Sequence, residues 1–146
     1  MKGLTIFQPW ASLIAAGDRQ FKTLGWYTSY RGPLLIHASS VFPEWARELC
    51  YNEPYLSLLA SIGFKNPDTL PRGILLAKCI LWDCRPFDSR KREWNRIIPI
   101  EREEGYVWCF EDLEPLESLI LVKGGKGLWN CPDEDFIINR LKCFGP

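Results

Sequence analysis

Residues 4–14 read LTIFQPWASLI and carry the clearest structural signal near the start of the chain. The apolar run over residues 3–7 is short enough for a strand, and a helix-like stretch follows over residues 11–16. Pro9 stands at the front of that stretch and Gly17 directly after its end, which is the usual punctuation of a helix. The chain is therefore predicted to begin with a strand and a short helix.

Further apolar runs predict additional strands. Residues 34–38 form an apolar run without helical spacing, which is typical of a buried strand. Residues 74–82 are the best candidate for a central strand, and residues 105–110 and 116–122 also have strand composition. Residues 85–104 are charge-dense and are predicted to be an exposed loop.

Helical character returns over residues 42–62, with Pro54 expected to break or kink the segment. The candidate inward positions there are Trp45, Leu49, Leu56 and Leu59. A short helix is predicted over residues 133–141, because its acidic start suits the helix dipole. Strands with inserted helices favour a single α+β domain over residues 1–146, built on a curved sheet or small β-barrel, rather than a doubly wound parallel sheet.

The composition limits the class of protein. The chain has 146 residues, is 47% hydrophobic, and carries 18 basic and 18 acidic side chains. This is typical of one soluble domain large enough to bury a core, and it excludes a collagen, a coiled coil and a disordered chain. The chain contains no apolar run of membrane-spanning length and no signal-peptide pattern, so a cytoplasmic location is expected.

Six cysteines and one histidine are the obvious metal-binding candidates. The cysteines are irregularly spaced and form no C-x-x-C pair, and only His37 could add an imidazole ligand. We therefore predict buried thiols that pack as small apolar residues, with no metal and no cofactor.

The charges are distributed unevenly along the chain. Residues 19–37 contain three basic residues and no acidic one, and residues 85–96 contain five basic and two acidic residues. Residues 101–117 contain seven acidic residues and one basic residue. This polarity predicts a basic face that could meet a polyanion.

Aromatic side chains are interleaved with the first basic stretch. Trp26, Tyr27 and Tyr30 lie within it, and Trp10 lies upstream. Positive charge that holds phosphates and rings that stack on bases are the means by which proteins bind single-stranded RNA. A well-packed aromatic core is the alternative, because seven tryptophans in a chain of this size cannot all be ligand platforms.

Three positions have open or structural interpretations. Arg31 could contact a phosphate or pair with an acid of residues 101–117. His37 lies in an apolar strand and is predicted to be a hydrogen-bonded core residue; as the sole histidine it excludes a ribonuclease mechanism with two imidazoles. Residues 123–127, Lys-Gly-Gly-Lys-Gly, form either a plain hairpin or a loop whose amides contact a phosphate.

Two long blocks of the chain resemble the ASCH domains. They are residues 4–17 and 26–39, and residues 122–124 and 127–129 resemble the C-terminal motif of that family. The resemblance implies the PUA-like fold, a small β-barrel with helices around it and a cleft between barrel and helices, and RNA as the chief ligand. It places these residues around the cleft: Gln8, Trp10, Trp26, Thr28, Arg31, Lys123 and Trp129.

The family includes RNA-binding modules, ribonucleases and small hydrolases of acylated cytidine, so fold alone does not select the function. The hydrolytic members have a lysine after the glycine and a threonine three residues later. Here Arg19 replaces the lysine, Lys22 stands at the threonine or glutamate position, and Leu24 replaces the usual arginine. An arginine is a poor proton shuttle, so these changes count against hydrolysis while adding positive charge.

The leading hypothesis is an RNA-binding domain with a basic, tryptophan-lined cleft. Its predicted phosphate ligands are Arg19, Lys22, Arg31, Lys123 and Lys126. A base is expected on Trp10, Trp26 or Trp129. The alternative is a metal-independent ribonuclease in which Lys22 or Tyr30 activates a ribose hydroxyl and Arg31 stabilises the phosphorane. An amidohydrolase acting on a modified nucleoside is third, and contact of the acidic segment with a protein partner or a second copy stays open.

Overall fold

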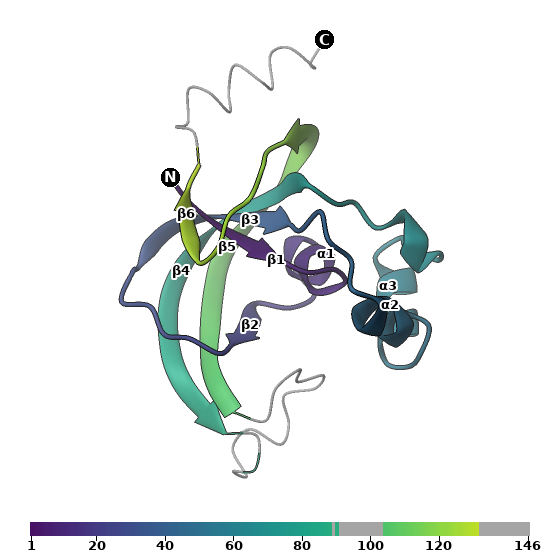
Figure 1. Ribbon diagram of the computed structural model, residues 1–146, viewed down its shortest axis with the longest axis horizontal. Helices are drawn as coiled ribbons and strands as arrows, with labels where there is room; N and C mark the ends of the chain where they lie inside the picture. The colour runs from purple at the N-terminus through teal and green to yellow at the C-terminus, as the bar shows by residue number, and fades with distance from the viewer. Residues whose placement is uncertain (89, 91–103, 132–146) are drawn as a thin grey trace.

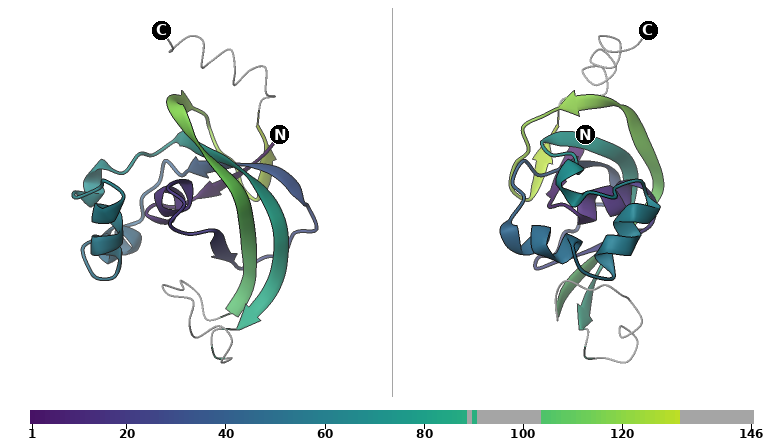
Figure 2. Two further views of the ribbon diagram at one scale, coloured as in Figure 1. Left: turned by 180° about the vertical axis from the view of Figure 1, so that it is seen from behind. Right: turned by 90° about the vertical axis from the view of Figure 1, so that its right-hand side faces the viewer.

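A computed structural model describes residues 1–88, 90 and 104–131 of the chain, and it is built around one mixed sheet. The strand order is β2-β5-β4-β3-β1-β6, and only β1 and β3 run parallel. The strands are β1 (Lys2–Ile6), β2 (Phe21–Leu24), β3 (Gly32–Ala38), β4 (Ile74–Asp88), β5 (Glu104–Leu121) and β6 (Leu128–Asn130). The sheet curls into a half-barrel (Figures 1 and 2), which confirms the predicted α+β fold on a curved sheet.

Three helices and one 3₁₀ turn accompany the sheet. They are α1 (Trp10–Ala15), α2 (Glu44–Cys50), α3 (Tyr55–Ser61) and η1 (Pro67–Thr69). Helix α1 lies on the concave side of the half-barrel, whereas α2 and α3 pack together at its side (Figure 2). Pro54 stands at the start of α3, so the predicted break is confirmed. Gly17 follows α1 with a φ of 79°, a left-handed conformation that glycine adopts without strain.

The main core forms where α1 fills the curl of the sheet. Residues Trp10 through Ile14 of α1 are all buried, and they pack against buried residues of β3 and β5. Leu34 through Ala38 are also buried, which confirms the predicted buried strand. Each large apolar side chain removed from water contributes about 1.5–3 kcal/mol to stability. A helix of six residues is too short to be stable by itself, so α1 is stabilised by its packing against the sheet.

The two long strands differ from the prediction. β4 extends past residue 82 to Asp88, and the two short strands predicted over residues 105–122 are one continuous β5. The ends of the predicted loop over residues 85–104 therefore pair with each other, Asp88 opposite Glu104. Three register shifts between β4 and β5 bend this hairpin, as β-bulges do. The strand ends of this hairpin face solvent and carry charged residues, so their composition resembles that of a loop. This is why the sequence predicted a loop where the structure has paired strands.

The short edge strands β2 and β6 were not predicted. Each has three or four residues, too few to show a period-two pattern. They occupy the two edges of the sheet. The predicted helix over residues 133–141 and the basic residues 91–96 lie outside the described part of the chain.

The inward face of α2 also differs from the prediction. Trp45 and Leu49 are exposed, so their assignment to the core was wrong, whereas Leu59 of α3 is fully buried as expected. The break at Pro54 ends α2 early, and Ala46 and Cys50, four residues apart, are the residues that face the core. The exposed Trp45 ring is thereby left at the surface.

The cysteine prediction is confirmed for five of the six thiols. Those five are buried and free: Cys50, Cys79, Cys84, Cys109 and Cys131. Burial raises the pKa of the Cys79 thiol to about 12 and that of Cys50 to about 11. Both thiols are therefore protonated and unreactive near neutral pH. In the described residues no helix is both long enough and apolar enough to span a membrane.

Candidate nucleic-acid interface

A cavity of about 270 Å³ lies between α1, β1, β2 and α2, and we call it the aromatic pocket. Its lining consists of Thr5, Ile6, Phe7, Trp10, Lys22, Thr23, Leu24 and Trp45. These residues come from the end of β1, the connection to α1 and the start of α1, from β2, and from the start of α2. The pocket lies between the sheet and helices α1 and α2. Two residues of the predicted site, Trp10 and Lys22, line it, whereas Trp45 lines it without having been predicted as a site residue.

Lys22 places a positive charge inside the aromatic pocket. Its Nζ lies 4.9 Å from the centroid of the Trp10 ring and donates a hydrogen bond to the Thr23 carbonyl at 3.1 Å. The residue is only 8% exposed. The ammonium is held by a cation–π contact and by the main chain, so its position is defined before any ligand arrives. An ammonium only donates, and it therefore favours a ligand that presents acceptors.

Trp10 forms a wall of the pocket and is not an open stacking platform. It is 2% exposed, and its Nε1 donates to the Tyr55 hydroxyl at 3.0 Å. Trp45 is 55% exposed and covers Trp10, with ring centroids 5.7 Å apart. The exposed Phe7 ring meets Trp45 edge to face at 6.3 Å. The rings accessible at the mouth of the pocket are therefore Phe7 and Trp45.

Neither of these two rings was predicted as a site residue. Phe7 stands directly before the Gln8-Pro9-Trp10 turn, and Trp45 stands on the face of α2 opposite its buried small residues. The sequence signal that could have revealed the exposure of Trp45 is the spacing of Ala46 and Cys50. These two small residues are four positions apart and so share a helix face that does not include Trp45.

A second cavity, of about 560 Å³, lies beside the loop of residues 122–127, and we call it the glycine-loop pocket. Its lining consists of Thr5, His37, Ser39, Ser40, Gly73, Leu121, Val122, Lys123, Gly124, Gly125 and Lys126. Thr5 lines both pockets, so the two cavities are neighbours across β1.

A chain of hydrogen bonds holds this loop against the sheet. Trp129 Nε1 donates to Thr5 Oγ1 at 3.0 Å, Thr5 Oγ1 lies 3.1 Å from His37 Nδ1, and His37 Nε2 lies 2.6 Å from the Val122 carbonyl. Since a carbonyl only accepts, the network assigns the imidazole proton to Nε2, and the Thr5 hydroxyl donates to Nδ1. His37 is thus a hydrogen-bonded core residue, as predicted.

The electrostatics of His37 agree with this role. Burial lowers its pKa below the ordinary value of 6.5, although the hydrogen bond to the Val122 carbonyl opposes that shift. The imidazole is therefore neutral at pH 7, and both of its nitrogens are engaged. It positions the loop and is not placed to act as a general acid or base.

Two glycines let the loop lie close to its neighbours. A Cβ atom on Gly124 would overlap Thr5 Oγ1 and lie 2.7 Å from His37 Nδ1. A Cβ atom on Gly127, whose φ is 61°, would lie 3.9 Å from the edge of the Trp26 ring. The loop therefore runs between Trp26 and Trp129. Four predicted site residues meet along it: Trp26, Lys123, Lys126 and Trp129.

Two other predicted ligands are buried inside the domain. The Gln8 amide is fully buried, donating to Ser12 Oγ at 2.8 Å and to the Pro71 carbonyl at 2.7 Å, and accepting from the Ser12 amide at 3.0 Å. Arg19 is buried with its guanidinium 5.1 Å from the centroid of the Phe21 ring. Neither side chain lines either pocket, so both support the fold around the site.

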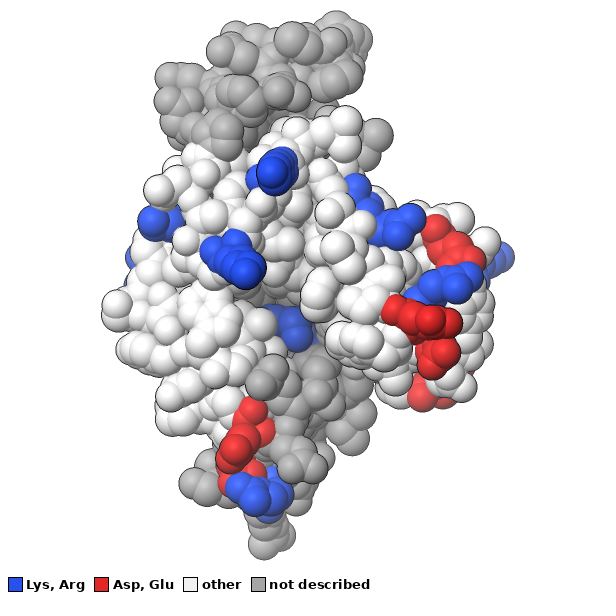
Figure 3. Space-filling model, in the orientation of Figure 1, with Lys and Arg blue, Asp and Glu red and all other residues white. Residues whose placement is uncertain are grey.

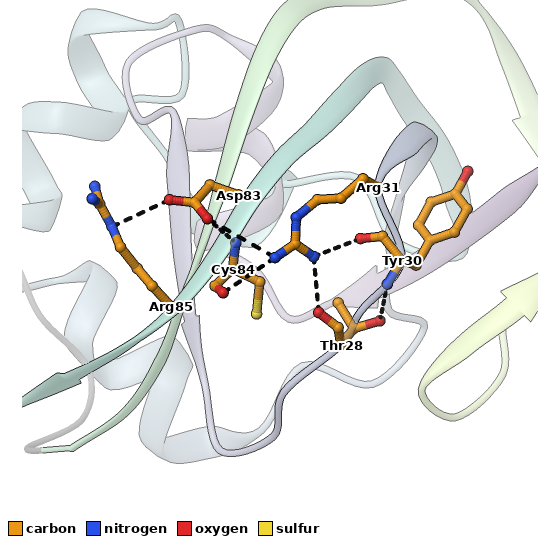
Figure 4. A network of polar contacts seen from close by, with 6 residues as sticks. All are labelled: Thr28, Tyr30, Arg31, Asp83, Cys84 and Arg85. Carbon is orange, nitrogen blue, oxygen red and sulfur yellow. Dashed lines mark hydrogen bonds and ion pairs between the residues drawn. The ribbon is translucent and has the colours of Figure 1, made fainter.

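Arg31 ties the loop before β3 to strand β4 (Figure 4). Its Nη1 donates to the carbonyls of Thr28 at 2.9 Å and Tyr30 at 2.8 Å, and its Nη2 donates to the Cys84 carbonyl at 3.3 Å. Its acidic partner among the described residues is Asp83 of β4 at 3.9 Å, rather than an acid of residues 101–117, which was one of the two alternatives that the sequence left open. This geometry gives Arg31 a positioning role.

The residues of the ribonuclease alternative do not all line the aromatic pocket. Lys22 lines the aromatic pocket, and neither Tyr30 nor Arg31 does. The Tyr30 hydroxyl donates to the Pro33 carbonyl at 2.6 Å, and Thr28 Oγ1 accepts from the Tyr30 amide at 3.1 Å. Both side chains serve the turn before β3.

Basic side chains dominate one part of the surface. Figure 3 shows several of them on the upper half of the face that is turned toward the viewer, and one in a hollow near its middle. The acidic side chains visible on this face lie over the helices at the right and at the lower end. In the described residues the basic and acidic segments of the predicted separation meet in the β4–β5 hairpin, where Arg90 lies 3.6 Å from Glu104, so they do not form two opposite faces.

Comparisons with known proteins agree with this architecture. The chain is 30% identical over 128 residues to human and to mouse "Activating signal cointegrator 1", which covers 86% of this chain and 21% of each relative. The chain thus spans about a fifth of the length of these relatives. No family model matches it. The crystal structure of ASCH from Zymomonas mobilis superposes with a TM-score of 0.50 at 10% identity, covering 97% of this chain and 93% of the other.

The curled mixed sheet with α1 in its hollow is the PUA-like α+β fold. The chain shares this fold with the ASCH structure, and the resemblance to the ASCH domains found in its sequence is confirmed.

Proposed function

We propose that this domain binds single-stranded RNA and takes one base into the aromatic pocket. The observation that carries the proposal is the pair of exposed rings, Phe7 and Trp45, beside the enclosed Lys22 ammonium. A base could stack on these rings while its acceptor atoms receive a hydrogen bond from Lys22. The cavity of about 270 Å³ lies near the lower end of small-ligand sites, which suits a single base.

The ligand class is supported by the ASCH fold and by the basic surface. Phosphates require positive charge, and Lys123 and Lys126 stand exposed on the loop next to the aromatic pocket. Trp26 and Trp129 border the same loop and extend the surface available to a strand. Gln8, Arg19, Thr28 and Arg31 are proposed to act indirectly, by holding the surrounding backbone.

A ribonuclease has less support, because two of the side chains that it requires are already engaged by the main chain. The Lys22 ammonium lies in the aromatic pocket, while the Tyr30 hydroxyl and the Arg31 guanidinium are engaged by main-chain carbonyls. An amidohydrolase would need a nucleophile where Lys22 stands. We therefore favour a binding module over an enzyme.

The test is fluorescence anisotropy with a labelled single-stranded RNA, using Trp45→Ala and the matched variant Trp82→Ala. Trp82 is 47% exposed on β4 and lines neither pocket. Loss of one stacked base costs about 1–3 kcal/mol, so Trp45→Ala should weaken binding by about 5- to 150-fold while Trp82→Ala leaves it unchanged. Absence of binding at low salt, or equal effects of both variants, would reject the proposal. A denaturing gel of the same samples reports cleavage.

A further inference from the structure

We propose that the glycine-loop pocket is a phosphate-binding site, separate from the aromatic pocket. The inference deepens the proposed RNA binding and relies on it only for the source of the phosphate. Because Thr5 lines both cavities, a nucleotide with its base in the aromatic pocket could place its phosphate in the glycine-loop pocket.

The charge of this pocket is positive and uncompensated. Lys123 and Lys126 line it, and no carboxylate does. Neither lysine has an ion-pair or hydrogen-bond partner among the described residues. A phosphate group entering the pocket would therefore meet two ammonium groups without displacing an existing partner.

The pocket also supplies neutral hydrogen-bond donors. Ser39 Oγ accepts from the Val41 amide at 3.1 Å, which leaves its hydroxyl proton able to donate, and Ser40 presents an exposed hydroxyl. In the part of the chain that the structure describes, the main-chain N–H groups of residues 123–126 donate to no other residue. Unpaired amides in a glycine-rich loop are typical of anion sites.

The site is organised before a ligand binds. His37 forms a hydrogen bond with the Val122 carbonyl at the start of the loop. Two residues further on, the backbone of Gly124 packs directly against the side chains of Thr5 and His37. His37 and Thr5 form directly opposite positions of the parallel pair β1 and β3. A loop held in this way loses less conformational entropy on binding than a free loop would.

The experiment records ¹H–¹⁵N spectra of the whole chain during titration with inorganic phosphate, at constant ionic strength kept with chloride. We expect shifts at Ser40, Gly124, Gly125 and Lys126. Removing one charged hydrogen bond should weaken phosphate binding about tenfold, so Lys123→Gln and Lys126→Gln are each expected to do so. Lys65→Gln is the control, since Lys65 is exposed, carries the same charge and lines neither pocket.

Two further titrations identify the source of the phosphate, one with a nucleoside 5′-monophosphate and one with single-stranded RNA. Tighter binding of the nucleotide than of phosphate, with shifts at both pockets, would place a nucleotide across Thr5. Phosphate binding without RNA binding would support the site and reject the proposed function. RNA binding that depends on Trp45, with no phosphate shifts or with equal effects in Lys65→Gln, would reject the phosphate site alone.

Discussion

The Lys22 ammonium faces the Trp10 ring at 4.9 Å from its centroid and is bonded to the neighbouring Thr23 carbonyl. In the residue pattern Lys22 is one of several basic residues suited to a phosphate. In the structure it lies inside an aromatic cavity, where a base is the better partner.

Replacing Lys22 with Met tests this assignment, because methionine has a similar length and no charge. We expect RNA affinity to fall about tenfold, the loss of one charged hydrogen bond, with little change in the salt dependence of binding. A lost phosphate contact would instead reduce the slope of log K against log salt by about 0.7 for single-stranded RNA. Anisotropy at four salt concentrations distinguishes the two outcomes, and Lys126→Gln is the comparison that should show the smaller slope.

Gly124 should tolerate no side chain, although its backbone conformation would permit one. A Cβ atom there collides with Thr5 Oγ1 and His37 Nδ1, whereas a Cβ on Gly125 would lie 3.2 Å from Trp129 Cβ. We therefore expect Gly124→Ala to lower the melting temperature more than Gly125→Ala does, and to weaken phosphate binding. Thermal denaturation followed by circular dichroism checks the order of the two variants, and equal melting temperatures would contradict the close contact.

His37 predicts a loss of stability in mildly acidic solution. Its pKa is lowered in the folded state, so below pH 6.5 the unfolded chain takes up a proton that the folded chain resists. The contribution of His37 to the free energy of unfolding is therefore expected to be constant above pH 6.5. It should fall as the pH drops below 6.5 and level off below the pKa of the folded state.

The measurement is urea denaturation between pH 5.5 and 7.5, with His37→Gln as the comparison. The variant should be less stable at pH 7, since the relay to Thr5 and Val122 is altered, yet its stability should change less over this range. His37 is the sole histidine, so imidazole titration in the chain has one source. Parallel pH profiles for the two proteins would disprove the lowered pKa.

Arg31 is expected to matter for stability rather than for RNA affinity. Arg31→Lys keeps the charge, but a single ammonium group cannot replace the guanidinium that donates to three carbonyls. We therefore expect a loss of about 1.5–3 kcal/mol in the free energy of unfolding. Denaturant titration gives that value, and anisotropy should give an unchanged salt slope. A reduced slope with full stability would restore the phosphate role predicted from the sequence.

Local patterns in the sequence were sufficient for the elements whose signals are local. Pro9 and Gly17 marked the limits of α1, Pro54 separated α2 from α3, and the run over residues 34–38 identified β3. These predictions succeeded because backbone restrictions and periodic burial act within one segment. The same patterns also brought out the glycine-rich loop and His37.

The two pockets depend on neighbours that are distant along the chain. The strand order β3-β1-β6 brings Thr5 beside His37 and Trp129, and nothing in the local pattern specifies that order. Trp45 was assigned to the core because a tryptophan in an amphipathic segment is usually buried, but the short α2 presents Ala46 inward instead. Burial depends on which surfaces the folded chain brings into contact, so residue type indicated the ligand chemistry while sheet topology set the position of each side chain.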